Sequence, residues 1–100
     1  MNIQNVYHLV SDHYLINNPN IQWVRGVGEE SRLYKICAES ESYALKVRPV
    51  EDELSDKLEQ GARAALHLQS KGFRATPIPV PCRNGSLVAR HGGVIAVLYT

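Results

Sequence analysis

The segment Tyr43-Ala44-Leu45-Lys46-Val47-Arg48 places a lysine between two aliphatic residues. Its aromatic and aliphatic side chains favour a β-strand over residues 43–48, and successive side chains of a strand point to opposite faces. Lys46 therefore points away from the face of Leu45 and Val47. Taken by itself, this is the position of an ordinary lysine on the solvent face of an amphipathic strand, and its neighbours decide whether it does more.

Two more strands precede this one. Residues 21–25 alternate apolar and polar side chains, as a half-buried strand does, and residues 33–38 form the next strand. A glycine-bearing connection, residues 26–31, and a polar turn, residues 39–42, join the three strands. Consecutive strands with short connections normally form an antiparallel meander.

One helix is predicted before this meander in the sequence and another after it. Residues 3–14 form the first, because apolar side chains recur at gaps of three and four. These side chains are Ile3, Val6, Tyr7, Val10 and Tyr14. After Pro49 ends the third strand, a second apolar stripe predicts a longer helix over residues 52–71. That stripe consists of Leu54, Leu58, Gly61, Ala62, Ala65 and Leu68. The acidic residues 51–53 suit its N-terminus, and Lys71-Gly72 suits its C-terminal end.

The C-terminal part of the sequence predicts two further strands. The prolines of residues 76–81 exclude a helix and suit an extended linker across the surface. Turn signals at Asn84-Gly85 and His91-Gly92-Gly93 bound a short strand over residues 87–90, and residues 94–99 form an almost wholly apolar strand. The order predicts a single α+β domain over the whole chain. It has a five-stranded, mostly antiparallel sheet with one long helix packed on it and a short N-terminal helix.

Composition narrows the class of protein. A net charge of +1 gives no broad basic field, and the arginines are scattered, so nucleic-acid binding is not expected. No apolar run approaches the roughly 18 residues of a membrane helix, and no signal peptide is visible, so the protein is expected to be cytoplasmic and not membrane-bound. Cys37 and Cys82 lack the paired spacing of a zinc site, and both are expected to be buried free thiols.

The loop between the first two strands has features of a phosphate-binding loop. Gly26-Val27-Gly28 allows the backbone to approach a ligand closely and to turn its N–H groups toward phosphate oxygens. The protein-kinase pattern has a third glycine where this chain has Ser31, whose hydroxyl also bonds phosphate. An ordinary hairpin turn is the alternative explanation of this loop.

The long helix offers a carboxylate to Lys46. A lysine that holds phosphates works best when a carboxylate fixes its position. Glu59 flanks the apolar stripe, at the edge of the expected contact with the sheet. A solvated surface glutamate is the alternative reading, and Glu51, Glu53 and Asp56 are competing partners for the lysine.

Together these motifs resemble the N-terminal, ATP-binding lobe of the aminoglycoside phosphotransferase and choline kinase-like family. The resemblance runs through residues 24–48, 59–68 and 72–79, with a strand ending in Leu-Lys, a helix with an acid before Leu-x-Leu, and a glycine before a Pro-x-Pro linker. Asn84-Gly85-Ser86 resembles the family's short hairpin, and Leu98-Tyr99-Thr100 resembles the start of its hinge.

The resemblance implies a kinase-like N-lobe that binds ATP. Lys46 would contact the α- and β-phosphates and Glu59 would orient Lys46. The glycine loop would cover the phosphates, and the hinge would meet adenine through backbone groups. The nucleotide-binding residues that it implies are Lys46, Glu59, Gly26, Gly28, Ser31, Leu98 and Tyr99.

The resemblance also implies that half of an active site is absent. In this family the catalytic aspartate and the Mg²⁺ ligands lie in a larger C-terminal lobe, and no His-x-Asp motif with a downstream asparagine and aspartate occurs here. This chain is therefore expected to hold no catalytic or metal-binding residue and to be inactive alone, with the small-molecule acceptor bound only through the missing lobe. The predicted function is the nucleotide-binding lobe of an ATP-dependent phosphotransferase acting on a hydroxyl of a small molecule.

A second hypothesis is a non-catalytic protein-interaction module with the same fold. The apolar strand over residues 94–99 and the proline-rich linker would then line a partner site. Self-association or association between lobes would use the same hinge side.

Overall fold

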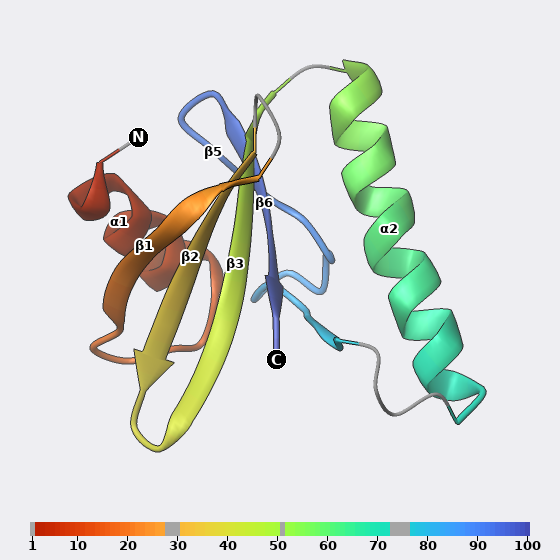
Figure 1. Ribbon diagram of the computed structural model, residues 1–100, viewed down its shortest axis with the longest axis horizontal. Coiled ribbons are helices and arrows are strands. Elements are labelled where there is room, and N and C mark those ends of the chain that lie inside the picture. Colours follow the sequence, from red (N-terminus) through yellow and green to blue (C-terminus); the bar gives the residue numbers. More distant parts are fainter. Residues whose placement is uncertain (1, 28–30, 51, 73–76) are drawn as a thin grey trace.

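The computed structural model describes residues 2–27, 31–50, 52–72 and 77–100 (Figure 1). Within these ranges the chain forms two helices and six strands. In chain order they are α1 (Ile3–His13), β1 (Asn20–Val27), β2 (Ser31–Ala38), β3 (Glu41–Pro49), α2 (Asp52–Ser70), β4 (Pro79–Val80), β5 (Ala89–His91) and β6 (Val94–Tyr99). The predicted α+β class is confirmed. The helices and the five predicted strands begin and end within two residues of the predicted positions.

The strands pair antiparallel in the order β1-β2-β3-β6. Two short strands pair with the edge of β6 that faces away from β3. β5 pairs with the first half of β6, and β4 pairs with its last two residues. The sequence predicted five strands and placed Pro79–Val80 in an extended linker. These two residues form a sixth strand instead, which is compatible with proline because proline is tolerated at the first position of an edge strand.

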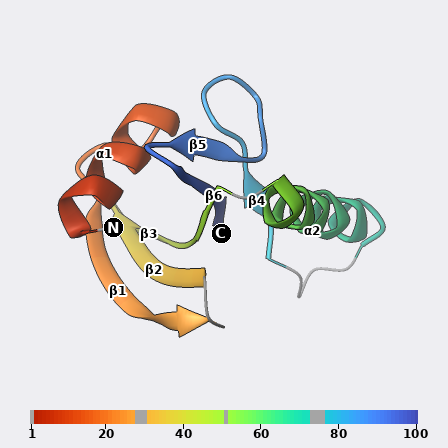
Figure 2. The same ribbon diagram turned by 90° about the horizontal axis from the view of Figure 1, so that it is seen from above.

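The two helices lie on opposite sides of the sheet, as Figure 2 shows. β6 contributes to both layers: Ala96 and Leu98 lie in the core beneath α1, whereas Ile95 and Val97 lie in a smaller core beneath α2. This alternation follows from the period of two along a strand. A strand that is buried on both faces needs apolar residues at every position, which explains the composition of residues 94–99.

The face that α1 buries differs from the one that the sequence predicts. Val6, Leu9 and Val10 are fully buried, whereas Ile3 and Tyr7 keep 44% and 39% of their surface exposed. Leu9, which the predicted stripe did not include, therefore takes the place of Ile3 and Tyr7 in the contact with the sheet. The helix is rotated slightly about its axis relative to the prediction.

The C-terminal end of α1 is tied to the loop that follows β4. The backbone N–H of Arg83 donates to the carbonyl of His13 at 2.8 Å. Its guanidinium donates to the carbonyls of Ser11 at 3.1 Å and Tyr14 at 3.3 Å. A cation is favourable there, because the last carbonyls of a helix have no partner within the helix. His13 also meets β5, where its Nε2 lies 3.2 Å from Nδ1 of His91.

α2 covers only part of its side of the sheet. It contacts β6, β3 and β4, and in the described ranges it makes no contact with β1 or β2. Leu58 and Ala62 pack on Ile95 and Val97. Leu68, at the end of the predicted apolar stripe, is 40% exposed, so the C-terminal part of α2 leaves the sheet. Neither described helix combines the length and apolar character needed to span a membrane.

The two cysteines are free thiols in different surroundings. Cys82 is buried, as the sequence predicts. Cys37 is only half-buried, contrary to the prediction, because it lies on the face of β2 that α2 does not reach. Its Sγ lies 3.7 Å from Oγ of Ser42 on β3.

Candidate functional site

Lys46 lies at the centre of the sheet. Its Cα is paired with Leu33 of β2 on one side and with Val97 of β6 on the other. Leu45 and Val47 point into the core beneath α1, so Lys46 points to the face on which α2 packs. Lys46 is half-buried there, whereas strand position alone indicated a lysine on the solvent face.

Arg48 shares this face with Lys46. It follows two residues later, paired with Ile95 of β6, and the rise of a strand puts the two Cα atoms about 7 Å apart. Burial lowers the pKa of Lys46, and the positive charge of Arg48 lowers it further. In the part of the chain that the structure describes, Lys46 has no ion pair, and the buried Nε of Arg48 has no hydrogen-bond partner. Two neighbouring cations with no ion pair to a carboxylate among the described side chains favour a bound anion.

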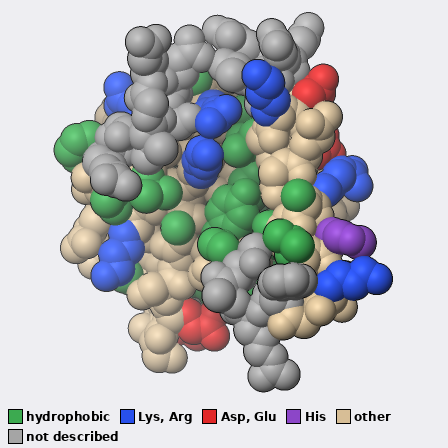
Figure 3. All heavy atoms as spheres, turned by 45° about the vertical axis from the view of Figure 1, so that its right-hand side comes forward, with side chains coloured by type: hydrophobic (Ala, Val, Ile, Leu, Met, Phe, Trp, Pro, Cys, Tyr) green, Lys and Arg blue, Asp and Glu red, His purple; other side chains and the backbone are tan. Residues whose placement is uncertain are grey.

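The rest of this face is mainly apolar, and α2 leaves the part formed by β2 uncovered in the described ranges. By the strand register, the side chains on it are Leu33, Lys35, Ala44, Lys46, Arg48, Val97 and Tyr99. Figure 3 shows hydrophobic side chains lying in a hollow between the sheet and α2, with Lys and Arg side chains at its border. An apolar hollow with a cationic end fits a ligand with a flat apolar ring and a negatively charged tail.

The loop end of the β1–β2 hairpin lies level with the end of β3. Gly26 of β1 is paired with Arg32 of β2, which is paired in turn with Val47. Ser31 is the first residue of β2, and Gly28 lies outside the described residues. The two described ends of the predicted phosphate-binding loop therefore lie closer to Arg48 than to the turn between β2 and β3.

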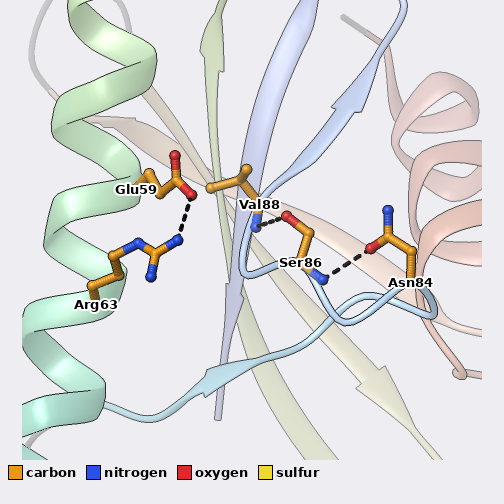
Figure 4. Close-up of polar contacts among 5 residues, drawn as sticks. All are labelled: Glu59, Arg63, Asn84, Ser86 and Val88. Atoms are coloured by element: carbon orange, nitrogen blue, oxygen red, sulfur yellow. Dashed lines mark hydrogen bonds and ion pairs between the residues drawn. The ribbon is translucent and has the colours of Figure 1, made fainter.

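Glu59 lies on α2 at the edge of the helix–sheet contact. Its side chain is 33% exposed, and its Oε1 accepts a hydrogen bond of 3.1 Å from Nη2 of Arg63, one turn further along the helix (Figure 4). Figure 4 also shows the Glu59 carboxylate on the side of α2 that faces Val88. Within the described ranges no hydrogen bond or ion pair joins Glu59 to Lys46. Its role as the orienting carboxylate stays a prediction.

The fold of this chain is similar to part of a solved enzyme. Over 99% of its length the chain matches the crystal structure of spectinomycin phosphotransferase, APH(9)-Ia, in complex with ADP and spectinomycin, with a TM-score of 0.77 at 20% sequence identity. The chain has the fold of a kinase-like N-terminal lobe. The match covers 29% of the enzyme's chain, so the present chain spans less than a third of that protein. No protein-family model and no curated protein sequence matches the chain.

In this N-lobe fold, the predicted hinge residues Leu98 and Tyr99 end β6. The side chain of Leu98 is fully buried beneath α1, whereas Tyr99 is half-buried on the α2 face, where burial raises its pKa. β3 and β4 flank β6 at both positions, and the N–H of Thr100 donates to the carbonyl of Ile78 at 2.9 Å. Backbone contacts from Leu98 and Tyr99 to adenine stay a prediction, and the Tyr99 ring is an additional group on the hollow.

Arg48 is a cation on this face that the sequence did not single out as a site residue. The signal was present, because a strand with a period of two puts residues 46 and 48 on one face. The sequence could not show that the Nε of Arg48 is buried without a partner, because this depends on how α2 and β6 pack around it.

Proposed function

We propose that this chain is the nucleotide-binding lobe of an ATP-dependent phosphotransferase that phosphorylates a hydroxyl group of a small molecule in the cytoplasm. The observation that carries the proposal is the position of Lys46. It is half-buried beside Arg48 on the face of the sheet that α2 partly covers, and no ion pair joins it to a carboxylate in the described ranges. The similarity to a phosphotransferase solved with ADP supports the same reading.

In this proposal the adenine occupies the apolar hollow and the phosphates reach Lys46. The ammonium group donates to the α- and β-phosphates, and such charge-assisted hydrogen bonds are about twice as strong as neutral ones. The loop at residues 26–31 covers the phosphates, and Leu98 and Tyr99 contact the adenine. Mg²⁺ would neutralise charge on the phosphates, and its ligands and the catalytic base would come from a second lobe outside this chain.

Glu59 orients Lys46 in this proposal, which requires it to exchange Arg63 for the lysine. The exchange costs little, because an i,i+4 ion pair on a helix contributes only about 0.3–0.5 kcal/mol. Arg63 is 70% exposed, so water takes over its hydrogen bonds when Glu59 leaves.

A calorimetric titration with ATP tests the proposed function. We expect the unmodified chain to bind ATP, and Lys46→Met to weaken binding about tenfold or more, since hydrogen bonds to charged groups contribute about 1.5–3 kcal/mol. Lys71→Met is the matched control, because Lys71 lies exposed beyond the end of α2. Failure of the unmodified chain to bind ATP contradicts the function, and equal affinity of Lys46→Met contradicts the role of the lysine.

A non-catalytic interaction module is the second candidate function. Trp23 and Val24 of β1 are 58% and 47% exposed, and exposed aromatic side chains are enriched at protein interfaces. A surface pocket of about 410 Å³ adjoins Trp23 and is lined by Asn2, Ile3, Trp23, Arg32 and Tyr34. Trp23 is paired with Tyr34, which packs under α1, so this surface lies on the face opposite the hollow. The sequence-based partner site along residues 94–99 is less suitable, because residues 95–98 are buried.

The two functions are separable by one comparison. If the chain is an interaction module, Trp23→Ala abolishes capture of its protein partner, and ATP causes no chemical-shift change in either form. If it is a nucleotide-binding lobe, Trp23→Ala binds ATP as the unmodified chain does.

A further inference from the structure

A second cation, Arg48, lies beside Lys46 on β3. Both side chains leave the same face of β3, about 7 Å apart at Cα, with Lys46 level with Val97 and Arg48 level with Ile95. The register also orders the rest of the site along β3. Ala44 and Tyr99 lie at one end and Lys46 lies in the middle. Arg48 lies at the other end, next to the loop end of the β1–β2 hairpin.

The surroundings of Arg48 leave part of its guanidinium without a partner. The residue is half-buried, and its Nε is buried without a hydrogen-bond partner in the described ranges. Burying a charged donor without an acceptor is costly, so a structure that tolerates it gains from an acceptor that binds later. A guanidinium presents its donors in a planar fork that matches phosphate oxygens, better than an ammonium does.

We propose that Arg48 binds the phosphate farthest from the nucleoside, so that the site selects nucleotides with two or three phosphates over monophosphates. This inference rests on the proposed function. With the base over Ala44 and Tyr99, the phosphate chain follows β3 past Lys46 toward Arg48 and the hairpin. Lys46 then holds the phosphates near the ribose, and Arg48 contributes only when the chain is long enough to reach it.

The test is a titration of the chain with AMP, ADP and ATP, followed by calorimetry or by amide chemical shifts. In the unmodified chain, affinity should rise from AMP to ATP. Arg48→Gln should leave AMP affinity within about twofold and weaken ATP affinity about tenfold, as expected when one charged hydrogen-bond donor is lost. Arg48→Lys should recover part of the loss, because it restores the charge without the planar fork.

Arg32→Gln is the matched control. Arg32 is paired with Val47 in the same region of the sheet, but its side chain lies on the opposite face. Its loss should therefore lower the affinity for AMP, ADP and ATP only slightly and by the same factor. A folded Arg48→Gln chain that loses AMP and ATP affinity by the same factor, or loses neither, overturns the inference. A lower melting temperature with unchanged nucleotide ratios also overturns it, because Arg48 would then serve the fold only.

The two proposals fail in different ways. If Lys46→Met weakens nucleotide binding and Arg48→Gln does not, only the role of Arg48 is wrong. If the unmodified chain binds none of the three nucleotides, the proposed function and this inference are both wrong.

Discussion

Arg48 lies two residues after Lys46 on the same face of β3, and the two positive charges oppose one another there. Burial is the larger cause of the lowered pKa of Lys46, and the charge of Arg48 is the smaller one. A site with this electrostatic character is unfavourable when empty and becomes favourable when an anion lies between the cations.

Arg48→Met should raise the pKa of Lys46 toward the ordinary value of about 10.4, because only burial then opposes its protonation. Chemical shifts of the lysine ε-methylene group against pH measure this change. Because the folded-state pKa of Lys46 is depressed, its protonation opposes folding at low pH, and this penalty disappears as pH rises from the folded toward the unfolded pKa. Bound ATP should move the pKa upward. An identical Lys46 titration in Arg48→Met and in the control Arg32→Met would show that the two cations are not coupled.

Arg83→Met should destabilise the fold by about 1–2 kcal/mol, because it removes the two side-chain hydrogen bonds to the carbonyls of Ser11 and Tyr14. For a chain of this length the melting temperature should fall by roughly 5–10 °C. Arg90→Met is the control, since Arg90 is an exposed arginine of β5. Equal melting temperatures for the two variants would mean that Arg83 does not anchor α1.

Leu98→Ala and Leu68→Ala compare the two ends of the burial scale with the same substitution. Leu98 is fully buried beneath α1. Leu98→Ala should lower the unfolding free energy by about 2–5 kcal/mol, because a cavity remains. Leu68 is 40% exposed, so Leu68→Ala should lower the unfolding free energy by less than about 1 kcal/mol. Urea denaturation measures both. A large loss for Leu68→Ala would mean that the end of α2 packs on the sheet after all.

Glu59→Gln and Arg63→Gln separate the observed ion pair from the proposed role of Glu59. Both variants should leave the unfolding free energy nearly unchanged, since the pair lies on the helix surface. Only Glu59→Gln should weaken ATP binding, because Lys46 then loses its orienting carboxylate, whereas Arg63→Gln frees Glu59 for the lysine. Calorimetry on the two variants decides this, and equal effects on ATP affinity would speak against the role of Glu59.

The sequence predicted most of the fold because its strands and helices have clear periods. Lys46 between Leu45 and Val47 indicated which strand face is buried, and the apolar run at residues 94–99 indicated a strand covered on both sides. Pro79–Val80 was missed as a strand, because two residues have no period and proline favours a linker.

The site was harder to predict than the fold, because it depends on how far α2 extends over the sheet. The half-burial of Cys37 follows from the absence of contact between α2 and β2 in the described ranges, whereas Lys46 lies on β3, which α2 contacts. No local pattern encodes this difference. The pairing of Glu59 with Arg63 was visible as an i,i+4 spacing, yet the spacing does not say whether the glutamate prefers Arg63 or Lys46.

Amide chemical-shift mapping with ATP tests most directly whether a nucleotide binds on the face between the sheet and α2. We expect the largest shifts on β2, β3 and the end of β6, around Leu33, Lys46, Arg48 and Tyr99. Trp23 and Val10, on the opposite face, should change little. Shifts centred on Trp23, or no shifts at millimolar ATP, would contradict nucleotide binding on this face.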